Sequence, residues 1–243
     1  MRAARVAEAR RSRQRQRLLK ILGSLVILSL VVAIVVAVVS AAGSNGNTTQ
    51  GTGEVVAPRN VDGAAIPVGN ADAPVTVEVF YDYMCPYCGA FEAANRADLE
   101  RLIEDGTVRL DLRPLSFLDE QSAGTEYSTR AANAIATTAD GAPQAVLAFH
   151  AGLYAEQPHE GAEGLTDDRI ADIATAAGVP QSVVDRFDDR RHDGWVAKVT
   201  EDAFSSGISG TPTVKINGTV FEGNLYAPGP LADAIAASAE GKR

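Results

Sequence analysis

The stretch Val75–Phe91, VTVEVFYDYMCPYCGAF, decides the fold of this chain. It begins as an apolar, β-branched run interrupted by single polar residues, which is typical of a strand. Cys85-Pro86-Tyr87-Cys88 follows, and a proline in second place favours the first turn of a helix. The two cysteines are therefore predicted to lie where a strand gives way to a helix.

The position of Cys85 predicts its chemistry. A sulfur just ahead of a helix faces unpaired backbone N–H groups and the positive end of the helix dipole, which both favour the thiolate. Cys88, one turn later, is then placed to attack a mixed disulfide formed at Cys85. Pro86 fixes φ and removes a donor, and Tyr87 adds a ring and a hydroxyl, so both are expected to tune the pair.

The chain contains only two cysteines, and both lie in this motif. A protein stabilised by disulfides in an oxidising compartment usually carries more of them. This pair closes a very small loop and would constrain little of the unfolded chain. The sequence therefore predicts a chemical rather than a structural use of the two thiols.

FYDYMCPYC, followed far downstream by Gly210-Thr211-Pro212-Thr213, resembles the DsbA-like branch of the thioredoxin superfamily. The resemblance covers roughly residues 68–237. It implies a thiol–disulfide oxidoreductase with an α/β, thioredoxin-like fold and a helical domain inserted at about residues 120–207. It also implies that Pro212 is cis and packs beside the nucleophile, while Thr211 offers backbone hydrogen bonds to an extended substrate.

The sequence departs from this family at one position. Many relatives have a buried acid six residues before the first cysteine, where it assists proton transfer from the resolving thiol; here that residue is Val79. Glu78 is adjacent but points to the other face of a regular strand. Asp82 is a candidate for the missing role, although an aspartate at such a place also commonly orders its own turn.

The N-terminal part predicts a membrane anchor. Residues 21–39 contain no charge and are long enough to cross a bilayer as a helix. The first 20 residues carry eight Arg and Lys against the single acid Glu8, which predicts a cytoplasmic N-terminus and an extracytoplasmic domain. A buried core helix is excluded, because the run is apolar on every face. We expect a basic tail at 1–20, an anchor at 21–42, a flexible linker at 43–60 and the DsbA-like domain at 61–243.

A cleaved signal peptide is the alternative to a retained anchor. Small residues end the apolar run at Val39-Ser40-Ala41, as a cleavage site requires. The apolar part of a signal peptide is usually about 7 to 15 residues long, however, and this run is longer. Both alternatives place the domain outside the cytoplasm.

The charge excludes one class of partner. The net charge is −9 although the basic residues are concentrated in the short tail, so the rest of the chain is more acidic still. An acidic domain repels phosphate backbones, and we expect no nucleic-acid binding. The basic tail is expected to set the topology and to contact anionic lipid, with residues 21–39 inside the bilayer.

The rest of the chain supports the same architecture. A helix is predicted up to Glu104, then an alternating strand at Thr107–Leu115 and mainly helices from 121 to 207. Asn217-Gly218 predicts a two-residue hairpin between strands at 213–216 and 219–221. A final amphipathic helix is expected at Leu231–Ala239.

No metal or cofactor is predicted. His150, His159 and His192 lie more than about sixty residues from the cysteines, at no spacing typical of zinc ligands. Met84 adjoins Cys85, whereas copper-chaperone motifs resemble Met-x-Cys-x-x-Cys. Trp195 is expected in the core or at its rim.

Three functions remain open from the sequence. The first is a membrane-tethered oxidase that donates the Cys85–Cys88 disulfide to reduced or unfolded exported proteins. The second is a reductase or isomerase of the same fold, kept reduced by a membrane electron donor. The third is an exported scaffold without turnover, although a scaffold has no need of both cysteines. The family resemblance implies a membrane redox partner of the DsbB or VKOR type.

Overall fold

The computed structural model describes residues 55–241. The expected basic tail, the anchor and most of the linker lie outside these residues. Within 55–241, no helix is both long and apolar enough to cross a bilayer.

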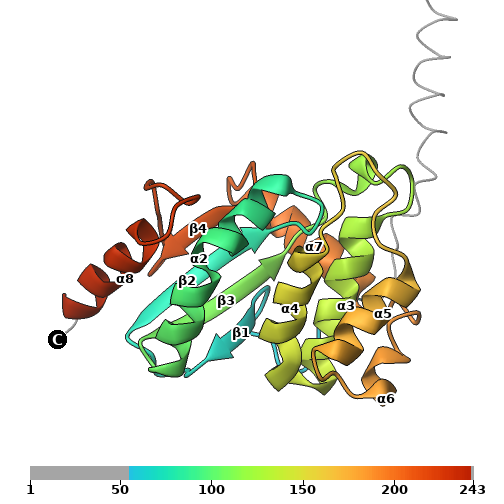
Figure 1. Cartoon of the computed structure of the whole chain (residues 1–243), viewed down its shortest axis with the longest axis horizontal. Coiled ribbons are helices and arrows are strands. Elements are labelled where there is room, and N and C mark those ends of the chain that lie inside the picture. Colours follow the sequence, from blue (N-terminus) through green and yellow to red (C-terminus); the bar gives the residue numbers. More distant parts are fainter. Residues whose placement is uncertain (1–54, 242–243) are drawn as a thin grey trace, which may run out of the picture. The chain divides into compact units, whose positions relative to one another are not determined.

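A five-stranded mixed sheet forms the centre of the domain (Figure 1). Its order is β1-β3-β2-β4-β5, with β3 parallel to β2 and the other neighbouring pairs antiparallel. Val77 on β2 aligns with Leu110 on β3 and, on the other side, with Ile216 on β4, and all three are buried. The strands are β1 (Ile66–Gly69), β2 (Val75–Tyr81), β3 (Val108–Pro114), β4 (Thr213–Ile216) and β5 (Thr219–Val220).

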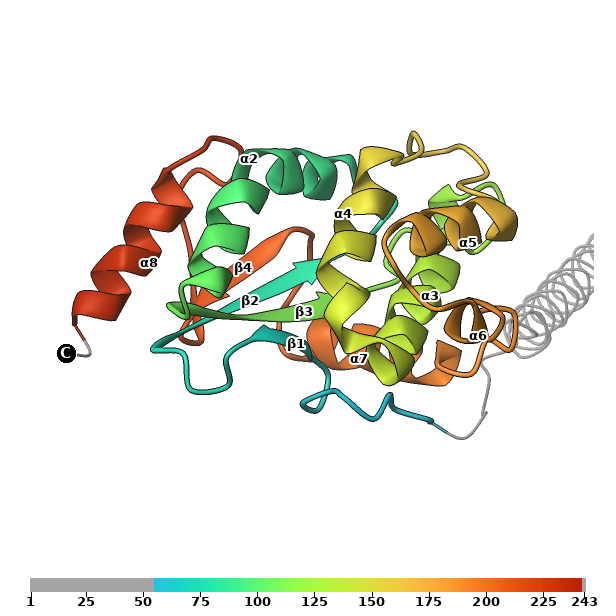
Figure 2. The same cartoon turned by 60° about the horizontal axis from the view of Figure 1, so that its bottom comes forward.

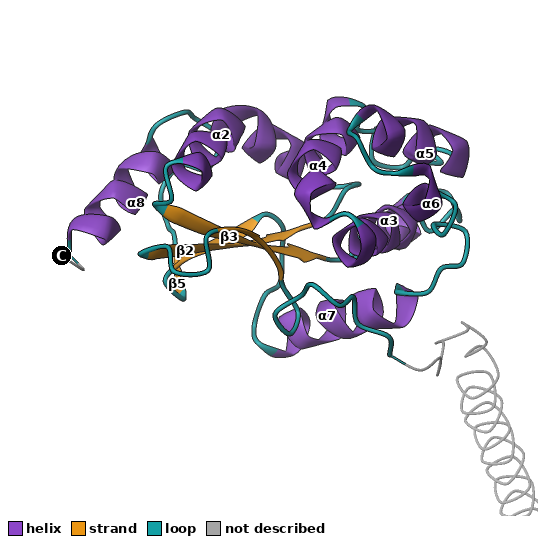
Figure 3. Ribbon diagram, turned by 90° about the horizontal axis from the view of Figure 1, so that it is seen from below, coloured by secondary structure: helices purple, strands orange, loops and turns teal. Residues whose placement is uncertain are grey.

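Helices cover both faces of the sheet. Figure 3 shows α2 (Pro86–Glu104) and α7 (Asp193–Ser205) on opposite sides of the strands, and both contact β3. The last helix, α8 (Pro230–Glu240), contacts α2 and β2. This arrangement of a βαβ unit, a hairpin and a terminal helix confirms the predicted thioredoxin-like fold.

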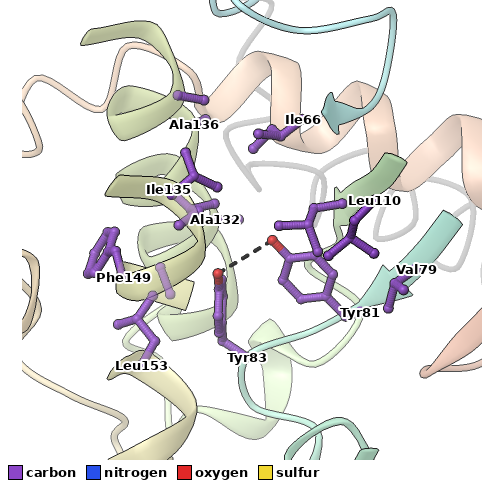
Figure 4. Close-up of a cluster of buried hydrophobic side chains, with 14 of the residues drawn as sticks. Ile66, Val79, Tyr81, Tyr83, Leu110, Ala132, Ile135, Ala136, Phe149 and Leu153 are labelled. Carbon is purple, nitrogen blue, oxygen red and sulfur yellow. Dashed lines mark hydrogen bonds between the residues drawn. The ribbon is translucent and has the colours of Figure 1, made fainter. Parts of the chain in front are cut away.

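The predicted helical insertion is also confirmed. It packs beside one end of the sheet, and α4 contacts α2 (Figure 2). Buried aromatic and aliphatic side chains fill the space between the insertion and the strands (Figure 4). Together with α7, the insertion consists of η1 (Asp119–Gln121), α3 (Tyr127–Gly141), η2 (Pro143–Ala145), α4 (Val146–Ala155), α5 (Asp167–Ala176) and α6 (Gln181–Val184).

Residues 56–60, at the end of the predicted linker, contact the helical insertion. The Arg59 guanidinium pairs with Asp140 at 3.0 Å, and the Asn60 amide donates to the Ala139 carbonyl at 2.9 Å. The ring of His192 lies 2.7 Å from the Val56 carbonyl oxygen. The contacts of the domain therefore begin before residue 61.

Two local predictions compare differently with the structure. The Asn217-Gly218 hairpin is confirmed, since these residues have φ values of 49° and 82°, as a type I′ turn requires. The region predicted to be mainly helical from residue 121, however, does not open with an α-helix, since α3 begins at Tyr127. The Ser122 hydroxyl donates to the Asp119 carbonyl and the Thr125 amide donates to the Ser122 carbonyl, so these residues form a turn before the helix.

Candidate active site

Cys85 lies at the junction that the sequence predicted. It is the N-cap residue of α2, in an extended conformation, and Pro86 occupies the first helical turn. The Cys85 thiol donates to the Thr211 carbonyl oxygen at an Sγ–O distance of 3.3 Å. Only 5% of Cys85 is exposed, so an attacking sulfur has a narrow approach beside the Thr211 backbone.

The two thiols have opposite proton affinities. A hydrogen bond from the Cys88 thiol, assisted by the Thr211 side chain and by the backbone N–H groups of Cys88 and Tyr87, lowers the pKa of Cys85 to about 6. Burial raises the pKa of Cys88 well above its ordinary value, and the neighbouring Cys85 sulfur raises it further. At neutral pH the first sulfur is therefore a thiolate and the second a thiol.

The Thr211–Pro212 peptide bond is cis, as the family resemblance implies. It precedes β4, whose residue Thr213 pairs with Phe80 on β2. β2, which is antiparallel to β4, leads directly into the cysteine motif, so the sheet brings the two distant motifs together. Thr211 is half-buried, and its carbonyl oxygen faces Cys85.

Asp82 is completely buried three residues before Cys85. One carboxyl oxygen accepts from the Met84 amide at 2.8 Å and from the Ser128 hydroxyl at 2.6 Å. The other accepts from the Leu118 amide at 2.9 Å. Burial raises the pKa of Asp82 to about 7 against the effect of these donors. Asp82 thus orders its own turn and ties that turn to the helical insertion.

Val79 and Glu78 lie as the strand pattern predicted. Val79 is buried in the core. Glu78 is half-buried, and its carboxylate accepts from the Arg113 guanidinium at 2.9 Å. No acid from β2 therefore takes the place that Val79 occupies.

Gln157 is a site residue that the sequence analysis missed. Its side-chain amide donates to the Tyr83 carbonyl at 3.0 Å and to the Cys85 carbonyl at 2.8 Å. A Cβ atom at Gly89 would lie 2.1 Å from the Gln157 Oε1 atom, so the glycine leaves the space that this amide needs. The only signal in the sequence was a glycine early in the active-site helix.

An exposed aromatic pair flanks the cysteines. Tyr87 is 63% exposed and Tyr226 is 50% exposed, and their ring centroids are 6.0 Å apart. Burial raises the pKa of Tyr226, and the charges of Cys85 and Cys88 raise it further. Asn95 on α2 holds this loop by donating to the Leu225 carbonyl at 2.7 Å.

The histidines make other contacts than metal ligation. His150 and His192 are buried and bond to the Tyr83 hydroxyl and the Val56 carbonyl, whereas His159 is exposed. Trp195 is a core residue whose indole N–H donates to the Gly63 carbonyl. Among the residues that the structure describes, no group of three or more His, Cys, Asp or Glu side chains is placed to hold a metal ion.

Comparison with known proteins places this geometry among redox proteins. The sequence profile of a family described as Thioredoxin matches residues 62–228. Disulfide bond formation protein D of Bacillus subtilis is 28% identical over 181 residues, covering 73% of this chain and 78% of that protein. The crystal structure of reduced DsbA from Mycobacterium tuberculosis superimposes with a TM-score of 0.60 at 27% identity, covering 73% of this chain and all of that one.

A similar segment also occurs inside a larger protein. The serine/threonine-protein kinase PknE of Mycobacterium tuberculosis is 31% identical over 121 residues, which are 48% of this chain and 21% of the kinase. The chain thus spans about a fifth of the length of PknE. The similarity to PknE concerns one segment and not the kinase as a whole.

Proposed function

This chain belongs to the thioredoxin family, and from that premise we propose that it is a DsbA-like thiol–disulfide oxidoreductase that donates its Cys85–Cys88 disulfide to exported proteins. One observation carries the proposal. Cys85 lies at the start of α2 against the Thr211 carbonyl, with its pKa lowered to about 6, while the pKa of the buried Cys88 is raised. A stabilised Cys85 thiolate favours the reduced pair, and this makes the disulfide an oxidant.

The oxidation proceeds in two exchanges. A substrate thiolate attacks the Cys85 Sγ atom, the Cys85–Cys88 bond breaks, and Cys88 leaves with the electron pair and takes up a proton. A second substrate thiolate then attacks the substrate sulfur of the mixed disulfide, and Cys85 leaves as a thiolate. The low pKa of Cys85 favours this second step, because a stable thiolate is a good leaving group.

The surroundings of Cys85 support an extended, unfolded substrate. The backbone at Thr211 and Pro212 lies beside the nucleophile and is partly exposed. Tyr87 and Tyr226 offer exposed aromatic surface next to it, which suits apolar segments that a folded protein buries. Pro86 and Tyr87 tune the pair by fixing the start of α2. Asp82 supports proton transfer in this proposal, as a buried acid whose pKa is raised to about 7.

The proposed location is the outer side of the cell membrane. Residues 21–39 would anchor the chain in the bilayer with residues 1–20 in the cytoplasm, as the charge pattern predicts. The oxidised pair would be restored by a quinone-linked membrane partner of the DsbB or VKOR type.

The direction of the reaction is tested by the redox state of the pair in the cell. Acid quenching followed by alkylation traps Cys85 and Cys88 as they are, and an oxidase is expected to carry mainly the disulfide. A mainly reduced pair, together with efficient refolding of scrambled disulfides, would favour the reductase or isomerase instead. If the correctly folded protein neither oxidises thiols nor rearranges scrambled disulfides, the result would support the scaffold.

A further inference from the structure

A buried acid lies directly behind the resolving cysteine. Glu92 follows Cys88 by four residues on α2, so the two side chains lie on one face of the helix, one turn apart. Only 8% of Glu92 is exposed, and its Oε1 atom has no hydrogen-bond partner among the described residues. An unsatisfied buried carboxylate oxygen costs stability and therefore calls for a function.

The other carboxylate oxygen begins a chain of polar contacts. Glu92 Oε2 lies 3.5 Å from Nε2 of His150 on α4, and His150 Nδ1 lies 2.9 Å from the Tyr83 hydroxyl. The Tyr83 and Tyr81 hydroxyls are 3.4 Å apart, and Figure 4 marks this contact. If Nε2 carries the imidazole proton toward the carboxylate, Nδ1 accepts from Tyr83, and the contacts form one directed chain.

The far end of this chain of contacts consists of buried tyrosine side chains. Burial is the main cause that raises the pKa of Tyr81 well above its ordinary value, and the charges of Glu92 and Cys88 both contribute. Tyr154 on α4 also lies within the influence of the Cys88 charge. These tyrosines stay protonated near neutral pH, and the Tyr83 hydroxyl is a hydrogen-bond partner of His150.

The Glu92 end of this chain of contacts opens toward solvent. Glu92 and His150 line a pocket of about 10 Å³ beside Val79, and the half-exposed or exposed side chains of Arg96 and Glu100 also line it. That volume is about what one water molecule needs. The family resemblance implies an acid at the position of Val79. In this chain the Glu92 carboxylate, on α2, lines the same pocket as Val79.

We propose that Glu92 and His150 form the internal acid–base pair that exchanges a proton with the Cys88 thiol, which lies one helical turn before Glu92 on α2. The inference rests on the proposed function and adds to it a route for the proton of the resolving cysteine. Glu92 lies on the same face of α2 as Cys88, and His150 acts through Glu92.

The protons and electrons balance in both directions. When a substrate thiolate breaks the Cys85–Cys88 bond, Cys88 retains the electron pair and receives a proton from the pair. When Cys88 attacks a mixed disulfide at Cys85, its thiol proton passes to the pair and the partner sulfur leaves as a thiolate. The high pKa of Cys88 makes such an acceptor necessary near neutral pH.

The test follows Cys88 attack directly. Oxidised thionitrobenzoate is attached to Cys85 of the full chain, and the release of the coloured thiolate is timed from about pH 5 to about pH 9. In Glu92→Gln the amide cannot take up a proton, so we expect release to slow about tenfold or more at neutral pH and the inflection at lower pH to vanish. Glu100→Gln, on the rim of the same pocket, is the matched control and should behave as the wild type.

Charged and titratable groups from three elements lie near Glu92 and His150. They are Tyr81 at the end of β2, Asp82 and Tyr83 just after it, Tyr154 on α4, and Cys88, Arg96 and Glu100 on α2. The same release experiment is therefore carried out with Asp82→Asn. If the inflection of the release rate at lower pH is lost only in Asp82→Asn, the assignment to Glu92 is overturned.

Tyr83→Phe provides a second variant, because it removes the hydroxyl that positions His150 and keeps the ring. It should reproduce the slow release, and it replaces Glu92→Gln if that protein does not fold. Wild-type rates and pH profile in either folded variant would overturn the inference. If the wild type itself never releases the thiolate, the proposed function fails instead, so the two failures are distinguishable.

Discussion

The Sγ atom of Cys85 lies 3.3 Å from the carbonyl oxygen of Thr211, although the two residues are 126 positions apart in the chain. The contact places the nucleophile of one motif against the backbone of the other. It forms because β2 and β4 pair antiparallel, so the end of β2 and the start of β4 lie at the same edge of the sheet. The proposed substrate recognition by the Thr211 backbone would therefore occur beside the reactive thiol.

The reactivity of Cys85 should titrate near pH 6. Because hydrogen bonds stabilise its thiolate, the rate of Cys85 alkylation by iodoacetamide in the reduced protein is expected to rise with a midpoint near this pKa. Cys88→Ala should move the midpoint upward, since the Cys88 hydrogen bond is the largest cause of the low value. A wild-type midpoint at the ordinary thiol value of about 8.5 would contradict the geometry.

Asp82 should make folding stability fall as the pH rises. Its pKa is raised from 3.8 to about 7 on folding, so the folded state binds the proton more tightly than the unfolded state, and stability declines between these two values. Asp82→Asn removes this titration, and urea unfolding at several pH values should show a flatter slope in that window. Asp72→Asn, at an exposed position, should retain the wild-type slope. Equal slopes in all three proteins would refute the assignment.

Gln157 should stabilise the cysteine loop through its two hydrogen bonds. Gln157→Ala is expected to lower the free energy of unfolding by about 1 to 3 kcal/mol, because the carbonyls of Tyr83 and Cys85 lose their donor. Gly89→Ala should also destabilise, because the new Cβ displaces the amide. In the Gln157→Ala background the same glycine change should become neutral or stabilising, since alanine favours a helix by about 1 kcal/mol. Additive effects would show that the two residues do not interact.

The sequence predicted the features that local patterns encode. The strand before Cys85, the proline after it and the Asn217-Gly218 turn each specify a backbone conformation within a few residues. The expected thioredoxin-like fold with its helical insertion followed from the two motifs together, and the structure and the family comparison confirm it. Residue roles such as substrate binding by Thr211 remain predictions.

The rest depends on packing between distant segments. Gln157 reaches the Cys85 carbonyl only because the insertion folds back onto the start of α2, 72 residues away. His150 meets Glu92 for the same reason, as α4 lies against α2. A histidine or glutamine in an amphipathic helix carries no local sign of such a partner, so these contacts become visible only in three dimensions.

The account is tested most directly by the covalent adducts of Cys88→Ala in the cell. Without the resolving thiol, Cys85 is predicted to remain joined to exported proteins as mixed disulfides that appear on a non-reducing gel and vanish on reduction. Cys85→Ala, the matched control, should form none. An absence of adducts in a folded, correctly located Cys88→Ala protein, or equal adducts in both variants, would contradict the claim that Cys85 is the attacking sulfur of a disulfide oxidoreductase.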